Sequence, residues 1–361
     1  MIHQNSTEIA VPDSADTAAD DQLSASAQAA MDAGMPANTR AAYRRAWKEF
    51  TAWCEREKRS ALPATSATLA GYVTYLCYER VPVNSRGTPV PGRIGLSPRS
   101  VTQAQWAIMK AHDLAEVEPP STMRAVQVIK GYRARLAEAR DPRARPQKAT
   151  AADRDALLRL QEAVAGDGLI GLRDQVMFLL HMFLAGRISE IVGLNIENVQ
   201  VLPRGLLISI YRQKTRTFQD IAIPRKDAPV AVKLTAKWMA ALAAHGRTSG
   251  PLFVRIDRHG NVGTGAGRSG SPAPSGEVYD GRIGTIRAEE RIHRAARIAG
   301  LDGRWSGHSF RRGFATEATR AGKSRLSISR RGGWAPNSEV LDGYIEEADP
   351  FSDGPLEGVG I

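Results

Sequence analysis

Six side chains in the second half of this 361-residue chain are suited to attack on a phosphodiester. They are three cations, an imidazole, an indole and a phenol: Arg187, Lys214, His308, Arg311, Trp334 and Tyr344. Guanidinium groups can hold phosphate oxygens bidentately, a phenol can act as the nucleophile, and a lysine can protonate the leaving oxygen. Fixed positive charge around the phosphate makes a metal ion unnecessary for such a reaction. The set therefore predicts phosphodiester cleavage by Tyr344.

Short motifs surround these residues, and their order is more specific than any single motif. The motifs are Ala185-Gly-Arg187-Ile-Ser-Glu190, Arg212-Gln-Lys214-Thr215, Trp305-Ser-Gly-His308-Ser-Phe-Arg311 and Gly332-Gly-Trp334, followed by Tyr344-Ile345. In this order and at these separations they resemble the tyrosine recombinase (phage integrase) family, and most closely its Cre-like branch. The resemblance runs over about residues 38–346 and is strongest over 172–346.

The resemblance implies which groups would make and break bonds. Tyr344 would attack the phosphorus and form a 3′-phosphotyrosyl link, while Lys214 would protonate the departing 5′ oxygen. His308 would take the phenol proton or steady the phosphorane. The interval from Trp334 to Tyr344 is ten residues, about one more than is usual in Cre-like members. A one-residue bulge in the Ala335-Pro-Asn337 turn would absorb the difference.

The resemblance also implies which groups would hold the phosphate. Arg187 and Arg311 would clamp it, and Glu190 would help to organise the site. Trp334, which stands where many family members have a second histidine, would donate its indole N–H to a phosphate oxygen and support the tyrosine helix. The neighbouring Arg312 is expected to point away from the site.

Charge is distributed unevenly along the chain and indicates a nucleic-acid partner. The whole chain has a net charge of +11, but residues 1–36 hold six acids and residues 345–361 hold five, with no Lys or Arg in either segment. The intervening residues therefore carry all 49 basic residues against 27 acidic ones, a balance of +22. Such an excess is typical of a protein that binds DNA, although a merely soluble basic protein is the alternative.

Composition and pattern predict a mainly α protein with a small antiparallel β-sheet. We expect a disordered acidic N-terminal segment (1–36), an all-α unit (37–140), a basic linker (141–149), a mainly α catalytic unit (150–346) and an acidic C-terminal tail (347–361). By resemblance the all-α unit would be a SAM-like core-binding domain, and the two units would form a C-shaped DNA clamp. The linker is either a DNA-backbone contact or a solvated tether.

Apolar periodicity and turn residues place the elements within these units. Helices are expected near 38–56, 67–78, 98–115 and 121–139, then near 151–165, 173–184, 286–299, 308–321, 324–331 and 337–345. The Asn38-Thr39 pair is the expected cap of the first helix. Residues 206–211 and 217–223 predict a hairpin with Lys214 at its turn, and Leu252–Val254 predicts a third strand. The Gly- and Ser-rich stretch 257–285 predicts a surface loop.

Basic and polar side chains on these elements are the candidate DNA contacts. A glutamine can read adenine and an arginine can read guanine or hold phosphate, but solvated polar faces are the alternative. The candidates are Arg40, Arg44, Lys48, Arg99, Ser100, Gln103, Arg133, Arg143, Arg145, Arg212, Arg282 and Arg287.

The remaining expectations concern cofactors, partners and compartment. Cys54 and Cys77 fit a reduced protein, since they give neither a disulfide scaffold nor zinc spacing. No cofactor, metal or ATP is expected, and no signal peptide or spanning segment is evident, so a cytoplasmic, nucleoid-associated protein of a phage or bacterium is expected. By resemblance it would be a site-specific recombinase acting as a homotetramer on two inverted-repeat DNA sites. The alternatives are a type IB topoisomerase-like nicking-closing enzyme and a non-catalytic DNA-binding regulator.

Overall fold

The computed structural model of the protein describes residues 34–35, 37–83, 87–145, 148–263 and 280–348. The chain divides into two compact units, Met1–Gln147 and Lys148–Ile361. The predicted acidic N-terminal segment lies outside the described residues except for Gly34 and Met35, and so does the tail beyond Ala348. Within the described residues, no helix has the length and apolar character needed to cross a membrane.

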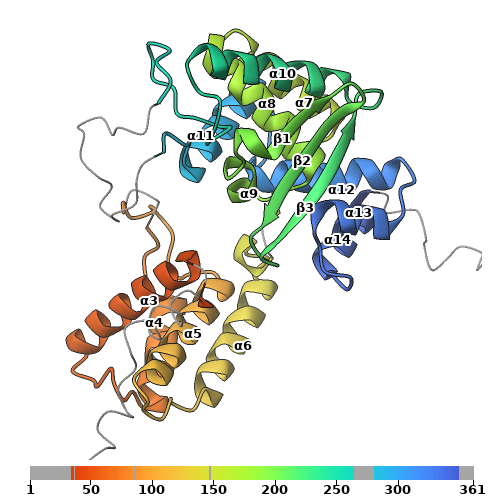
Figure 1. Cartoon of the computed structure of the whole chain (residues 1–361). Helices are drawn as coiled ribbons and strands as arrows, with labels where there is room; N and C mark the ends of the chain where they lie inside the picture. Colours follow the sequence, from red (N-terminus) through yellow and green to blue (C-terminus); the bar gives the residue numbers. More distant parts are fainter. Residues whose placement is uncertain (1–33, 36, 84–86, 146–147, 264–279, 349–361) are drawn as a thin grey trace, which may run out of the picture. The chain divides into compact units, whose positions relative to one another are not determined.

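The first unit is all-α, as its sequence predicts (Figure 1). Its helices are α3 (Ala37–Arg56), α4 (Ser66–Tyr78), α5 (Pro98–Leu114) and α6 (Met123–Glu138). Hydroxyl caps start two of them, because the Thr65 side chain accepts from the N–H of Thr68 and the Ser97 side chain accepts from that of Ser100. The first helix begins at Ala37, one residue before the expected Asn38 cap.

The core of this unit follows the helical spacing of its large apolar residues. Phe50, Leu69, Tyr72 and Ile108 are fully or almost fully buried and belong to one cluster. A 3₁₀ turn over Pro142–Ala144 follows α6, with the Asp141 side chain accepting from the N–H of Arg143. Proline at its first position is compatible with a turn and not with a continuing helix.

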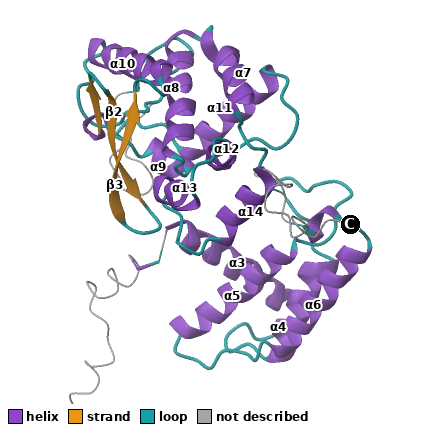
Figure 2. Cartoon of the chain, turned by 90° about the vertical axis from the view of Figure 1, so that its right-hand side faces the viewer, coloured by secondary structure: helices purple, strands orange, loops and turns teal. Residues whose placement is uncertain are grey.

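The second unit combines eight described α-helices with one sheet (Figures 1 and 2). The helices are α7 (Arg154–Ala165), α8 (Gly168–Leu184), α9 (Ile188–Val192), α10 (Pro229–Ala244), α11 (Thr285–Ile298), α12 (Gly307–Arg320), α13 (Arg325–Gly332) and α14 (Glu339–Ala348). The sheet is antiparallel in the order β1 (Val199–Leu202), β2 (Gly205–Arg212) and β3 (Thr217–Pro224). The mainly α prediction with a small antiparallel sheet is therefore confirmed.

Two details of this unit differ from the sequence prediction. The third strand of the sheet is β1. Leu252, Phe253 and Val254 are all buried, and this stretch has only isolated bridges, one at Pro251 and one at Val254. An apolar segment whose side chains are all buried can pack in the core without pairing with a strand of the sheet. Helix α10 was not predicted, although Pro229 stands at its first turn and its buried positions repeat at helical spacing.

Helix α8 forms the centre of the second unit. Val176, Met177 and Phe178, which point to different sides of it, are fully buried, as its nearly continuous apolar sequence predicts. Elsewhere in the same core, the indole N–H of Trp238 donates to the carbonyl of Leu252 at 2.9 Å. The core therefore fixes the C-terminal end of α8, and with it the loop that carries Arg187.

Candidate active site

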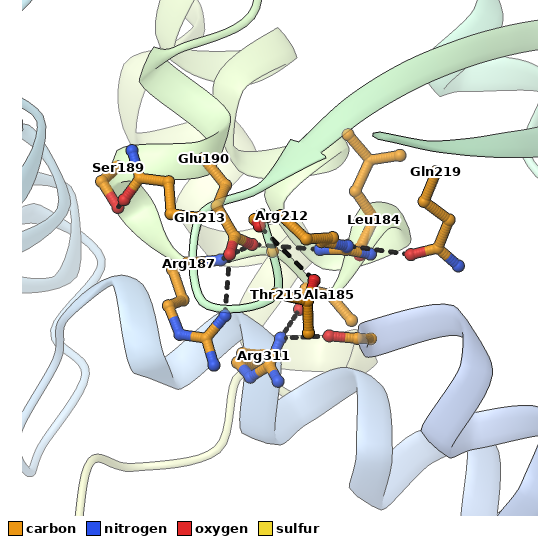
Figure 3. A network of polar contacts seen from close by, with 12 residues as sticks. Leu184, Ala185, Arg187, Ser189, Glu190, Arg212, Gln213, Thr215, Gln219 and Arg311 are labelled. Atoms are coloured by element: carbon orange, nitrogen blue, oxygen red, sulfur yellow. Dashed lines mark hydrogen bonds and ion pairs between the residues drawn. The ribbon is translucent and has the colours of Figure 1, made fainter. Parts of the chain in front are cut away.

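The first guanidinium is positioned where α8 stops and α9 begins (Figure 3). Ala185 ends α8 in the left-handed conformation, with φ of 47°, and Arg187 is the N-cap of α9. The Glu190 carboxylate accepts from the backbone N–H of Arg187 at 2.9 Å and from its guanidinium at 2.7 Å. These two bonds to one carboxylate fix both the turn and the direction of the Arg187 side chain.

A second guanidinium, that of Arg212 at the end of β2, is buried against the same carboxylate. It donates to Glu190 at 3.1 Å and to the Gln219 side chain at 2.9 Å. Its Nη2 donates to the carbonyls of Leu184 at 3.0 Å and Arg331 at 2.6 Å. Arg212 is 2% exposed, which differs from the exposed position that the predicted DNA contact requires. It joins β2 to the ends of α8 and α13 beneath the site.

Glu190 is ionised because its two arginine partners outweigh its burial. Burial alone would raise the pKa of this carboxyl, but hydrogen bonds from Arg187 and the charge of Arg212 hold the pKa below its usual value. The carboxylate therefore neutralises part of the positive charge that the buried Arg212 brings into the site.

Removal of this carboxylate is expected to destabilise the second unit strongly. Glu190→Ala leaves the buried Arg212 without its counter-charge, and we expect a loss of about 3–5 kcal/mol in unfolding free energy at neutral pH. Because the folded pKa of Glu190 is depressed, its contribution is present above the ordinary pKa of 4.5 and is lost as pH falls through the folded value. Urea unfolding at pH 7 and at pH 4 should show the deficit narrowing at the lower pH. The exposed Glu162→Ala is the control, and an equal deficit in both variants would contradict this account.

Arg311 is the third guanidinium of the site and is also buried. It is 4% exposed, and its Nη1 donates to the carbonyl of Ala185 and, at 2.6 Å, to that of Gly332. Its Nη2 has no hydrogen-bond partner among the described residues. Burial, with the charge of Arg187 adding to it, lowers the pKa of Arg311 to about 9, which still leaves it cationic at neutral pH. Arg311 thus offers a fixed cationic donor for an anion.

The indole of Trp334 connects Arg311 to Tyr344. The guanidinium carbon of Arg311 lies 3.8 Å from the Trp334 ring centroid, and this ring meets that of Tyr344 edge to face with centroids 6.5 Å apart. Gly332 makes room for the indole, because a Cβ there would lie 1.9 Å from Trp334 Cζ3. The phenol is therefore placed in the same cluster as the Arg311 guanidinium.

Ion pairs hold the tyrosine helix α14 on its own unit. Glu347 pairs with Arg312 and with Lys148, and Asp342 pairs with Arg325 at 2.6 Å. The guanidinium carbon of Arg312 also lies 5.9 Å from the Tyr344 ring centroid. From the sequence, Arg312 was expected to point away from the site. The acidic Glu347 at the end of the tyrosine helix was the one sequence signal for its ion pair.

His308 and Lys214 are the more exposed members of the predicted set. His308 follows the first residue of α12, and the protein packed on one side of its imidazole lowers its pKa, with the charges of Arg311 and Arg187 adding to the effect. Lys214 is exposed in the turn between β2 and β3. That turn is tied to α9 through Ser189, whose hydroxyl donates to the Gln213 side chain at 2.7 Å.

The candidate DNA contacts fall into two groups. Most are exposed on helices of the first unit or just after them: Arg44, Lys48, Arg99, Ser100, Gln103, Arg133 and Arg145, with Arg40 half-buried. Arg143 and Arg282 instead bond within the protein, the first to Asp141 and to the carbonyl of Gly95, the second to the carbonyls of Val192 and Leu194. Arg287 is exposed on α11 and pairs with Glu290 at 2.5 Å.

Two further residues of the site were not singled out by sequence reasoning. His181 is fully buried in α8, and its Nε2 lies 3.1 Å from the carbonyl of Gly186, to which it donates. Burial lowers the pKa of this imidazole to about 3, so it stays neutral and holds the loop before Arg187. Glu289 of α11 accepts from the N–H of Gly307 at the start of α12. Neither lies in a recognisable motif.

Known proteins share both the sequence pattern and the fold. The Phage integrase family model matches residues 152–349, more than half of the chain. An integrase/recombinase XerD homologue of Selenomonas ruminantium is 24% identical over 342 residues, covering 93% of this chain and 89% of the relative. The Cre recombinase of Escherichia phage P1 is 22% identical over 304 residues, covering 84% and 82%.

A solved structure, that of a lambda integrase dimer bound to a COC′ core site, matches with a TM-score of 0.52 at 13% identity. The match covers 91% of this chain and 95% of that one, and it agrees with the fold described above. The family match covers the segment that holds Arg187, Lys214, His308, Arg311 and Tyr344. The chain therefore belongs to the phage integrase family, the tyrosine site-specific recombinases, which act on DNA.

Proposed function

We propose that this recombinase cuts and rejoins DNA through a 3′-phosphotyrosyl intermediate on Tyr344 and exchanges strands between two sites. The observation that carries the proposal is the contact of the Arg311 guanidinium with Trp334, which packs against Tyr344. A nucleophile, a fixed cation and a ring between them form one cluster. Arg187, oriented by Glu190, is the second cation for the phosphate.

In each step of the proposed chemistry, one ester bond to phosphorus forms as another breaks, so the phosphate remains a diester. The Tyr344 oxygen bonds to phosphorus while the bond from phosphorus to the 5′ oxygen breaks. The phenol proton passes to His308, and Lys214 gives a proton to the departing 5′ oxygen. A 5′ hydroxyl from a partner duplex then reverses the reaction. Because the phosphotyrosyl ester keeps the energy of the broken bond, strand exchange requires no ATP.

A plasmid that carries two copies of the selected binding site tests this function. Binding-site selection from random DNA provides the site, and the expected result is deletion or inversion of the segment between the copies. Relaxation of supercoils without rearrangement would instead indicate a topoisomerase-like enzyme. Binding without any covalent complex on a nicked substrate would indicate a non-catalytic regulator.

We also propose that both units contact the same duplex and that the enzyme works as a homotetramer on two inverted-repeat sites. The exposed polar side chains of α3 and α5, including Arg44, Lys48, Arg99 and Gln103, support DNA contact by the first unit. Its DNA substrate would be bacterial or phage DNA in the cytoplasm; the sources of the two relatives, a bacterium and a phage, support the choice of DNA. Plasmid multimer resolution and phage integration are both compatible with this assembly.

Deletion of residues 350–361 is expected to abolish synapsis of two sites and to leave binding to one site nearly unchanged. These residues lie outside the described part of the chain. Their sequence is acidic yet contains Phe351, Leu356, Val359 and Ile361, apolar residues suited to docking on a neighbouring protomer. Gel-shift titration with one-site and two-site DNA measures both effects. A truncated protein that recombines at the full-length rate would show that the segment is only a frayed terminus.

A further inference from the structure

The helix that carries His308 and Arg311 begins against a carboxylate from another helix. Both oxygens of Glu289, on α11, accept from the backbone N–H of Gly307 at 3.0 and 3.2 Å. Gly307 is the first residue of α12, so this N–H is one of the donors that a helix start leaves without an intrahelical partner. Glu289 therefore fixes the position of the residue immediately before His308.

Close packing at Gly307 leaves this junction little freedom. A Cβ there would lie 2.8 Å from Ile188 Cβ, 2.9 Å from His181 Cε1 and 3.1 Å from Glu289 Oε1. The start of α12 is thus enclosed by α8, α9 and α11. A change in the Glu289 side chain would act directly on the placement and the electrostatics of the neighbouring imidazole.

Charged groups around His308 oppose each other. Arg311 on the same helix and Arg187 at the start of α9 lower its pKa, in addition to the larger effect of burial. Glu289 is the group that acts in the opposite direction. His181 on α8 is buried and neutral, so it supplies no counter-charge. A base between two guanidiniums accepts a proton poorly unless a negative charge offsets them.

We propose that Glu289 is a positioning residue that holds the start of α12 and supplies the negative charge that allows His308 to accept the phenol proton. This inference rests on the proposed function and adds a residue to it. The proton moves from the Tyr344 oxygen to the imidazole of His308 and is not passed on to Glu289. Glu289 touches neither DNA nor the phosphate in this role.

The test compares Glu289→Gln with wild type in single-turnover cleavage of a nicked substrate as a function of pH. Glutamine keeps the length of the side chain and an oxygen that accepts from Gly307, but it removes the charge. We expect the ascending limb of the rate profile to move to lower pH by about one unit, as for loss of one nearby opposite charge. We expect the plateau rate to fall by roughly tenfold, because a weaker base is a poorer proton acceptor. DNA affinity should be unchanged.

Two further variants make the result decisive. Glu162→Gln, on the exposed side of α7, has the same change of charge and should match the wild-type profile. Glu289→Asp keeps the charge, so its ascending limb should stay at the wild-type pH even if its shorter side chain lowers thermal stability. A Gln profile that overlays the wild type, or an Asp limb displaced as far as the Gln limb, would overturn the inference.

The proposed function and this inference fail in distinguishable ways. If wild type forms a covalent complex and Glu289→Gln behaves as wild type does, only the role of Glu289 is wrong. If wild type forms no covalent complex at any pH, the proposed function is wrong and the role of Glu289 falls with it.

Discussion

Tyr344→Phe should bind DNA with wild-type affinity and form no covalent complex with it. The substitution removes only the hydroxyl, and the ring can keep its edge-to-face contact with Trp334. The ring also packs on a small buried cluster of Ala315, Ile328 and Leu341, so α14 should stay in place. Without the phenol oxygen, no bond to phosphorus can form.

Two assays on the same protein preparation measure this prediction. Gel shift under native conditions reports affinity, and electrophoresis in detergent reports covalent complex on a nicked substrate. Tyr211→Phe is the matched control, because Tyr211 is an exposed tyrosine of the same unit, on β2. It should form wild-type amounts of complex. Any detergent-resistant complex formed by Tyr344→Phe would show that another group is the nucleophile.

Lys214→Ala is expected to slow cleavage by about 10²–10⁴-fold, the usual cost of losing a general acid. The departing 5′ oxygen needs a proton, and Lys214 lies in an exposed turn that is tied to α9, the helix capped by Arg187. A substrate with sulfur in place of the bridging 5′ oxygen should restore the rate, because a thiolate leaves without protonation.

Rescue by the sulfur substrate distinguishes a lysine that donates a proton from one that only contributes positive charge. Arg216→Ala removes another cation from the same turn, and any loss of rate that it causes should persist with the sulfur substrate. If Lys214→Ala cuts the sulfur substrate as slowly as the ordinary one, Lys214 acts on something other than the leaving group.

Local spacing made part of the site predictable from the sequence. His308 and Arg311 are three residues apart on α12, and Glu190 is three residues after Arg187, where a cap to the helix start is expected. Helix α8 was predictable as a buried element from its continuous apolar run. In each case the partners are close in sequence, so a periodic pattern fixes their relation.

The burial of Arg212 depends on partners that are distant in sequence. Strand alternation puts Arg212 on the inward side with Ile208 and Ile210. This signal was missed because Arg212 was interpreted as part of the basic turn around Lys214. The carbonyl groups that accept its hydrogen bonds belong to Leu184 and Arg331, and no local sequence pattern indicates them. Arg282 is similar, since its acceptors on Val192 and Leu194 lie about ninety residues earlier in the chain.

The central claim is that Tyr344 becomes joined to the 3′ phosphate of cut DNA, and mass spectrometry of the trapped complex tests it most directly. Wild-type protein is incubated with a nicked substrate, the adduct is digested with protease and nuclease, and the nucleotide-bearing peptide is sequenced. The account predicts one such peptide, with the added mass on Tyr344 and a free 5′ hydroxyl on the released strand. An adduct on any other residue, or cleavage that leaves no adduct at all, would contradict it.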